Sequence, residues 1–221
     1  MRACSFYLVS PIGLATGTLS LNDAASLLRD AIEAPGVEAF LLKSGGSGAA
    51  PADAGLIAQI ERLRPLLHAA GIPLLLEERA DLVQSHGCDG VHVEGPKRRV
   101  AAVRQALGED TIVGASAAAS RHQAMEAGKA GADYIAFGNC DHELQPPDPE
   151  LLSWWQEMME PPCVAMGGIA LDNALEMAEA GADFLALRQA VWNHERGPRA
   201  ALQAFAQRLA EAEDQAGRLK S

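Results

Sequence analysis

The sequence predicts an α/β fold, a single-domain (β/α)8 barrel of the TIM type that spans residues 1–221. Three observations predict this fold. Short apolar segments alternate along the chain with longer segments in which apolar residues recur at helical spacing. Eight such pairs fill the chain, and strands that alternate with helices form a parallel sheet. Eight parallel strands can close on themselves, which removes the exposed edges of the sheet.

The predicted strands and helices follow one another in a regular order. The strands comprise residues 6–9, 39–42, 73–76, 90–93, 112–115, 134–137, 163–166 and 184–187. The helices comprise residues 21–34, 53–70, 81–86, 97–107, 120–130, 149–159, 171–180 and 198–217. Leu56, Ile60 and Leu63 are typical of the helical segments, because their spacing places apolar side chains on one face. No linker, low-complexity tract or block of charge divides the chain.

Glycine marks the end of several predicted helices. It directly follows a helical segment at positions 71, 87, 131 and 181. Glycine adopts the left-handed conformation that ends a helix at low cost. The repeat Ala-Gly-Ala-Asp precedes two strands, at 130–133 and 180–183, which indicates the same structural role in both places. The alternative fold, an open doubly wound sheet, needs a Gly-rich turn after the first strand, and residues 11–17 do not match G-x-G-x-x-G.

Composition excludes several classes of partner. The 221 residues are 48% hydrophobic and 21% charged, as in a globular domain with a sizeable core, and the formal net charge is −11. An acidic chain lacks the basic face that nucleic acid requires. No apolar run reaches the roughly 18 to 20 residues that cross a bilayer, and the N-terminal segment does not have the pattern of a signal peptide. The four cysteines are scattered and form no CxxC pair, so we expect a cytoplasmic protein without disulfides.

In a barrel of this type the functional site lies at the carboxyl ends of the strands and in the loops that follow them. The strongest signal is Gly167-Gly168, directly after the seventh strand. Two glycines let the backbone approach an anion closely, and their N–H groups with the positive end of the following helix favour phosphate. Arg188 and Gln189 follow the eighth strand and are expected to face the same spot. The sequence therefore predicts a phosphate site, with a plain tight turn and a surface cation as the alternative.

Two charged segments follow the second and third strands. Lys43 begins a Gly-rich segment that lacks the residue order of a P-loop, and we expect this cation to serve a small phosphorylated substrate. Glu77, Glu78 and Arg79 come after the third strand. Only one of the two glutamates should face the mouth of the barrel, because adjacent strand residues point to opposite faces. That glutamate is expected to bind a cation or to act as a base, and a charge cluster at a helix start is the alternative.

Two histidines are candidates for proton transfer. His92 lies within the fourth strand, where a lone histidine is more often a core or surface residue than a catalyst. His142 lies in the loop after the sixth strand and is better placed for acid–base chemistry, with a solvated loop histidine as the alternative. Further polar or glycine positions occur at the ends of the fourth, fifth and sixth strands: Glu94, Ser116 and Gly138.

Several short motifs carry a family resemblance. They are Tyr7-Leu8-Val9-Ser10, Asp89-Gly90-Val91-His92-Val93, Ile112-Val113-Gly114-Ala115-Ser116, Gly131-Ala132-Asp133-Tyr134-Ile135 with Gly138, Val164-Ala165-Met166-Gly167-Gly168-Ile169 with Asn173, and Gly181-Ala182-Asp183. In this order and spacing, over residues 5–195, the sequence resembles thiamine phosphate synthase and its relative, the thiazole tautomerase TenI. Each motif is short, and the specificity of the resemblance comes from their combination.

The resemblance implies a (β/α)8 barrel that joins a pyrimidine methyl pyrophosphate to a thiazole phosphate and releases pyrophosphate. It also implies Mg²⁺ and basic residues that stabilise the leaving group. By matching position, Lys43 takes the place of a pyrophosphate-binding Arg, Ser116 keeps a pyrophosphate-contacting Ser, and Gly167-Gly168 keep the thiazole phosphate site. Further residues are then expected to line the substrate site: Glu77, Arg79, His92 and Gly138.

The sequence departs from the family pattern where the metal and pyrophosphate are expected. The family's Gln-x-Arg reads Leu41-Leu42-Lys43, and its Asn-Asp-Arg reads Glu77-Glu78-Arg79, so that Glu78 is the candidate metal ligand, with Glu94 as a second. Lys97 stands where the family has another metal-binding carboxylate. Residues 140–145 bring acidic side chains where the family has hydrogen-bond donors, and like charges oppose the binding of a phosphate.

Three functions are therefore open from the sequence. The first is a thiamine phosphate synthase with altered ligands, in which Glu78 and Glu94 hold magnesium. The second is a metal-independent isomerase like TenI, in which His142 or a nearby glutamate moves protons on a phosphorylated thiazole. The third is a non-catalytic protein that binds a phosphorylated ligand. Self-association into a homodimer is left open.

Overall fold

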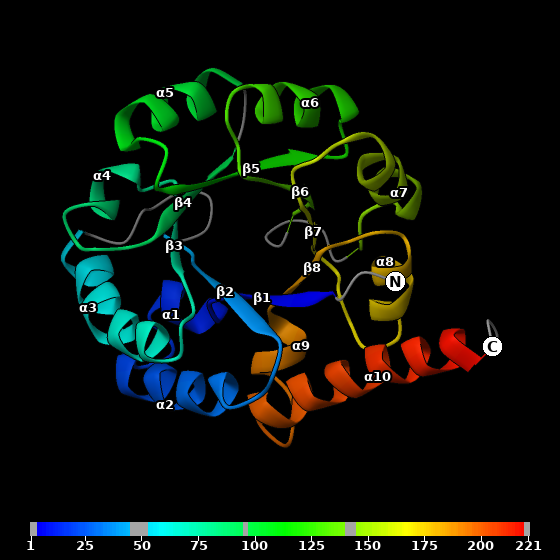
Figure 1. The fold of residues 1–221 in the computed structure, drawn as a ribbon. Helices are drawn as coiled ribbons and strands as arrows, with labels where there is room; N and C mark the ends of the chain where they lie inside the picture. The colour runs from blue at the N-terminus through cyan, green and yellow to red at the C-terminus, as the bar shows by residue number, and fades with distance from the viewer. Residues whose placement is uncertain (1–3, 45–52, 95–96, 140–144, 219–221) are drawn as a thin grey trace.

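The computed structural model describes residues 4–44, 53–94, 97–139 and 145–218. It confirms the predicted fold, because eight parallel strands form a closed barrel in the order of the chain, with the helices arranged around it (Figure 1). The strands are β1 Ser5–Val9, β2 Val37–Leu42, β3 Leu74–Glu77, β4 Gly90–Glu94, β5 Ile112–Ala118, β6 Tyr134–Gly138, β7 Cys163–Met166 and β8 Phe184–Leu187. All eight predicted strands are present.

The helices agree with the predicted order, with differences at their ends. They are α2 Leu21–Ile32, α3 Asp53–Ala69, α4 Ala80–Val83, α5 Lys97–Leu107, α6 Arg121–Lys129, α7 Pro149–Met158, α8 Ala174–Glu179 and α10 Pro198–Arg218. Two short helices were not predicted: α1 Ile12–Thr16 and α9 Gln189–Trp192. Each has five residues or fewer, which is too short to show a periodic apolar face. In the described part of the chain, no helix combines the length and the apolar character that a membrane crossing requires.

Side-chain caps fix where several helices begin. Ser20 accepts a hydrogen bond from the N–H of Asp23 at 3.1 Å, and Ser120 accepts one from the N–H of Gln123 at 3.2 Å. Asp148 caps α7 through the N–H of Glu150 at 2.9 Å. Each cap satisfies an N–H group that has no partner within the first turn of its helix.

Alternation along the strands divides the core into two layers. One set of strand side chains packs outward against the helices. The other set fills the inside of the barrel: Tyr7, Val9, Ala39, Leu41, Leu75, Tyr134, Ala136, Val164, Met166 and Ala186. Because strand side chains alternate with period two, the next inward positions toward the carboxyl ends of β2 and β3 are those of Lys43 and Glu77. The apolar barrel interior thus becomes polar at its mouth.

Three aspartates join pairs of strands at the opposite end of the barrel. A side-chain oxygen of Asp89 accepts a hydrogen bond from the N–H of Leu74 at 2.7 Å. Asp133 binds the N–H of Val113 at 2.7 Å, and Asp183 binds the N–H of Cys163 at 2.8 Å, in the same way. These links explain the Ala-Gly-Ala-Asp repeat, since its aspartate precedes β6 and β8 and holds the start of the preceding strand.

Candidate active site

A buried ion pair lies at the mouth of the barrel between β2 and β3. The Lys43 side chain is 2% exposed, and its ammonium contacts the Glu77 carboxylate. The N–H of Ser44 donates to Glu77 Oε2 at 3.2 Å, and the N–H of Lys43 donates to Ser10 Oγ at 3.0 Å. Buried charges persist only when they are paired and hydrogen-bonded, so Glu77 fixes the position of the Lys43 cation.

His92 occupies the centre of a hydrogen-bonded chain inside the barrel. Its Nδ1 lies 2.9 Å from the hydroxyl of Tyr134, and its Nε2 lies 3.0 Å from Ser116 Oγ. The Tyr134 hydroxyl lies 2.7 Å from that of Tyr7 across the barrel. Burial, together with the positive charge of Lys43, lowers the pKa of His92 to about 3, so the imidazole is neutral at physiological pH.

Tyr134 fits inside the barrel because position 114 has no side chain. A Cβ built on Gly114 meets the Tyr134 ring at 1.9 Å. Tyr7 and Tyr134 were not predicted as site residues. The period-two pattern of β5, in which residue 114 is an inward position two before Ser116, is the signal that identifies this space.

The two predicted metal ligands lie together at the ends of β3 and β4. Glu78 has a positive φ of 59°, and its carboxylate pairs with Arg99 and accepts the N–H of Glu94. The structure thus answers which glutamate faces the mouth, since Glu77 points inward to Lys43 and Glu78 points to Arg99. No group of three or more His, Cys, Asp or Glu side chains is gathered to hold a metal ion within the described ranges.

Glycines allow close contact of the backbone at the ends of β6 and β7. Gly138 has φ 87°, and a Cβ there meets the carbonyl oxygen of Met166 at 1.9 Å. Gly167 has φ 94°, and a Cβ there meets the carbonyl oxygen of Asn139 at 2.4 Å. A side chain at either position would clash and would also have to adopt a left-handed backbone conformation. Only glycine at these two positions allows the backbone segments to lie this close at this part of the mouth.

The loop after Gly167-Gly168 is held by Asn173. Its Oδ1 accepts the N–H of Ala170 at 3.0 Å, and its Nδ2 donates to the carbonyl of Gly168 at 2.9 Å. Among the described residues, the N–H groups of Gly167 and Gly168 have no hydrogen-bond partner. They are suited to an anion, and their role in binding phosphate stays a prediction.

The loop after β8 is tied to the end of β1. Arg188 Nε donates to the carbonyl of Ser10 at 3.0 Å, and Trp192 Nε1 donates to the carbonyl of Val9 at 2.6 Å. Arg188 and Gln189 line a cavity of about 350 Å³ with residues of α1 and α9, and Gly167-Gly168 do not line this cavity. The predicted phosphate role of Arg188 and Gln189 stays a prediction.

The two remaining predicted site residues are Arg79 and His142. Arg79 binds both oxygens of Asp81, with distances of 2.9 and 2.7 Å, and this hydrogen bonding lowers the pKa of Asp81. Its contact with substrate stays a prediction. His142 lies outside the described residues.

Comparisons with known proteins identify relatives of this chain. The sequence profile of the thiamine monophosphate synthase family matches residues 6–191. A thiamine-phosphate synthase from Rhodospirillum centenum is 42% identical over 210 residues, which cover 93% of this chain and 97% of that protein.

Two solved structures are similar to this chain over nearly its full length. The thiamine phosphate pyrophosphorylase from Pyrococcus furiosus superposes with a TM-score of 0.75 at 25% identity, over 94% of this chain and 96% of that one. The (S)-3-O-geranylgeranylglyceryl phosphate synthase from Thermoplasma acidophilum shares the fold alone, with a TM-score of 0.71 at 14% identity over 95% of this chain and 94% of that one. The full-length similarity to the Rhodospirillum protein and the family match show that this chain belongs to the thiamine monophosphate synthase family.

Proposed function

We propose that this chain joins a pyrimidine methyl pyrophosphate to a thiazole phosphate and releases pyrophosphate. The observation that carries the proposal is the 42% identity to a thiamine-phosphate synthase over nearly the full length of both chains. The polar mouth supports it, because it combines a cation with a hydroxyl and with backbone N–H groups that have no hydrogen-bond partner among the described residues, and such donors are suited to phosphates.

The bond changes of this reaction define what the site must stabilise. The C–O bond between the pyrimidine methylene and the pyrophosphate breaks, and its electron pair leaves with pyrophosphate. The lone pair of the thiazole nitrogen forms the new C–N bond to the methylene, so the product carries the positive charge on the thiazolium. No proton is transferred and no redox partner is needed. Negative charge grows on the pyrophosphate oxygen, and fixed donors at that point lower the barrier.

The residues of this chain provide such donors. We assign Lys43 and Ser116 to the pyrophosphate, with Glu77 holding the Lys43 ammonium in place. Gly167 and Gly168 offer N–H groups to the thiazole phosphate. The apolar barrel interior below the mouth limits the access of water, which would otherwise trap the pyrimidine cation in place of the thiazole nitrogen.

Glu78 does not fit a magnesium site in the arrangement described. One of its oxygens pairs with Arg99, and the other accepts the N–H of Glu94. Magnesium binds carboxylate oxygens in near-octahedral geometry with water and substrate phosphate, so Arg99 would have to move first. The assignment of Mg²⁺ to Glu78 and Glu94 stays a prediction, and the steps above do not depend on it.

The proposal is tested by mixing the purified chain with both substrates and Mg²⁺ and measuring pyrophosphate and thiamine phosphate. We expect equal amounts of the two products and no pyrophosphate when either substrate is omitted. Ser116→Ala should lower kcat roughly 10- to 100-fold, since a hydrogen bond to a charged group contributes about 1.5–3 kcal/mol.

Ser153→Ala is the matched control, because Ser153 Oγ bonds only backbone carbonyls, of Pro149 and Ala180, among the described residues. This variant should keep full activity. If no pyrophosphate forms at enzyme concentrations equal to those of the substrates, the proposed function is wrong.

A further inference from the structure

His92 is buried inside the barrel. It is 1% exposed, and its ring stacks on that of Tyr134 with centroids 5.7 Å apart. Both ring nitrogens are engaged, Nδ1 by the Tyr134 hydroxyl and Nε2 by Ser116 Oγ. Any effect of His92 on the reaction must therefore pass through these two hydroxyl groups.

A neutral imidazole has one N–H donor and one acceptor nitrogen, so the chain of hydrogen bonds has two possible directions. In one, Tyr134 donates to Nδ1, and Nε2–H donates to Ser116 Oγ. In the other, Ser116 donates to Nε2, and Nδ1–H donates to Tyr134. The two directions differ in what Ser116 can offer at the mouth. Only the first leaves the Ser116 hydroxyl hydrogen available for another acceptor.

Deprotonated phosphate and pyrophosphate oxygens accept hydrogen bonds and do not donate them, so such an oxygen bound at Ser116 requires the first direction. Ser116 lies at the mouth, where it pairs in register with Glu94 of the neighbouring strand, and it is partly exposed. Among the described residues, His92 Nε2 is the one hydrogen-bond partner of Ser116 Oγ. The other end of the chain is fixed by the buried contact between the hydroxyls of Tyr134 and Tyr7.

We propose that His92 is a positioning residue that, held by Tyr134, donates from Nε2 to Ser116 and so directs the Ser116 hydroxyl hydrogen toward an anionic oxygen of the substrate. The inference rests on the proposed function for the identity of the substrate. The hydrogen-bond geometry itself requires only an anion at Ser116. Burial, which lowers the pKa of His92, keeps the imidazole neutral and supports this assignment.

The test measures the Kd of inorganic pyrophosphate by calorimetry, and kcat and KM with both substrates. Ser116→Ala and His92→Leu should each weaken pyrophosphate binding about tenfold or more, as expected for the loss of a charge-assisted hydrogen bond. The double variant should bind no worse than either single variant, because the two residues act through one hydrogen bond. His92→Gln should recover much of the affinity, since its amide can donate to Ser116 as Nε2 does.

Val164→Ala is the matched control, because Val164 belongs to the same buried cluster inside the barrel and has no polar side-chain atom. It should lower stability without changing the Kd of pyrophosphate. If Val164→Ala weakens binding as much as His92→Leu does, or if the losses of His92→Leu and Ser116→Ala add, the proposal is wrong.

Tyr134→Phe is a second test of the proposal, for use if His92→Leu does not fold. It removes the group that holds Nδ1 as an acceptor, and it should weaken pyrophosphate binding in the wild type and not in Ser116→Ala. Equal losses in both backgrounds would overturn the proposal. Because these measurements need no turnover, a chain that binds pyrophosphate through Ser116 and makes no thiamine phosphate would contradict the proposed function and leave this inference intact.

Discussion

Lys43 and Glu77 depend on each other for stability. Removing one member of a buried pair leaves the other charge without compensation, which costs roughly 3–5 kcal/mol. We expect Lys43→Met to lower the free energy of unfolding by about this amount, measured by urea denaturation. Adding Glu77→Gln should recover most of the loss, because the amide still accepts from Ser44 and no charge is left buried. A double variant as unstable as Lys43→Met would contradict this account. Both variants should lose pyrophosphate affinity.

His92 also predicts how stability depends on pH. Its pKa is about 3 in the folded chain and near 6.5 in the unfolded chain, so below pH 6.5 the unfolded state binds more protons. Stability therefore falls as the pH is lowered from 6.5 toward 3. Between pH 6 and pH 5 the wild type should lose roughly 1 kcal/mol more than His92→Gln, measured by urea denaturation at each pH. Equal losses in the two proteins would show that His92 is not buried as a neutral group.

At the scale of single residues, the sequence predicted which polar residues lie at the site but not which residues they contact. Lys43 was predicted from its place after a strand, and the alternation rule showed that only one glutamate of the pair could face the mouth. The rule did not say which, because β3 ends one residue later than predicted, at Glu77, and Glu78 then turns away with a positive φ. Partner choice depends on where a strand ends, and single-residue boundaries are not encoded in an apolar pattern.

At the scale of elements, the aspartate before a strand determines how that strand pairs with its neighbour. Asp183→Ala leaves the buried N–H of Cys163 without its acceptor, which should lower the free energy of unfolding by about 1–3 kcal/mol. Asp183→Asn keeps an acceptor oxygen and should lose less. Asp172→Ala is the control, since Asp172 is exposed, and it should change stability by less than about 0.5 kcal/mol. Equal losses from all three changes, measured by thermal or urea unfolding, would contradict the proposed link.

Apart from the four-residue helix α4, the elements that the sequence predicted are those with enough residues to show a period. The strands and the long helices met that condition, whereas α1 and α9 did not. The helix predicted over 171–180 begins only at Ala174, because residues 171–173 form the turn in which Asn173 holds the loop after β7. Here side-chain hydrogen bonding to the backbone competes with helix formation.

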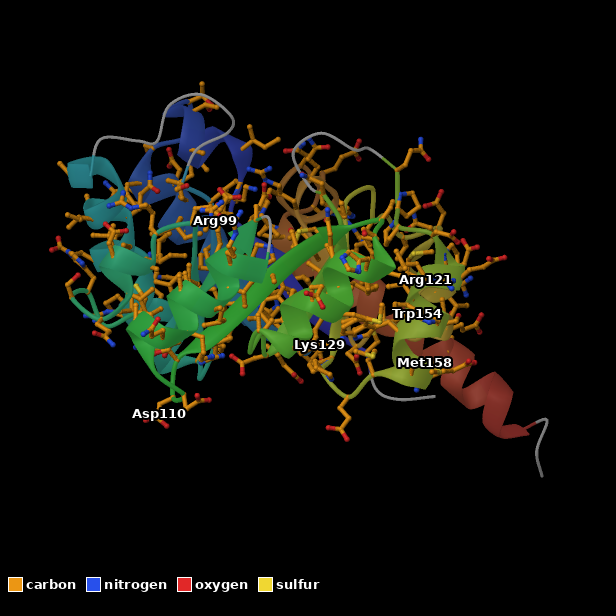
Figure 2. All side chains as sticks on the ribbon, turned by 90° about the horizontal axis from the view of Figure 1, so that it is seen from above. Arg99, Asp110, Arg121, Lys129, Trp154 and Met158 are labelled. Atoms are coloured by element: carbon orange, nitrogen blue, oxygen red, sulfur yellow. The ribbon has the colours of Figure 1, made fainter. Side chains whose placement is uncertain are left out.

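At the scale of the whole molecule, the alternation of strands and helices was sufficient to predict a closed barrel, and Figure 1 shows that closure. The surface was less predictable. Figure 2 shows Trp154 and Met158 on α7 near the outside of the barrel, where Arg121 lies over the Trp154 ring at 4.9 Å and Met158 is 67% exposed. Trp154 is partly buried and packs against the core, whereas Met158 is exposed. An apolar residue type does not determine burial when the position lies on the outer side of a helix.

The three aspartate links join β3 to β4, β5 to β6 and β7 to β8, so they group six of the strands as successive couples. A backbone break in the connection between α5 and β5 would leave each couple within a single fragment. A break between α6 and β6 would instead separate Asp133 from the strand that it holds. The two fragments produced by the first break keep every aspartate link within a single fragment. They are therefore better suited than those of the second break to reassemble into an intact barrel.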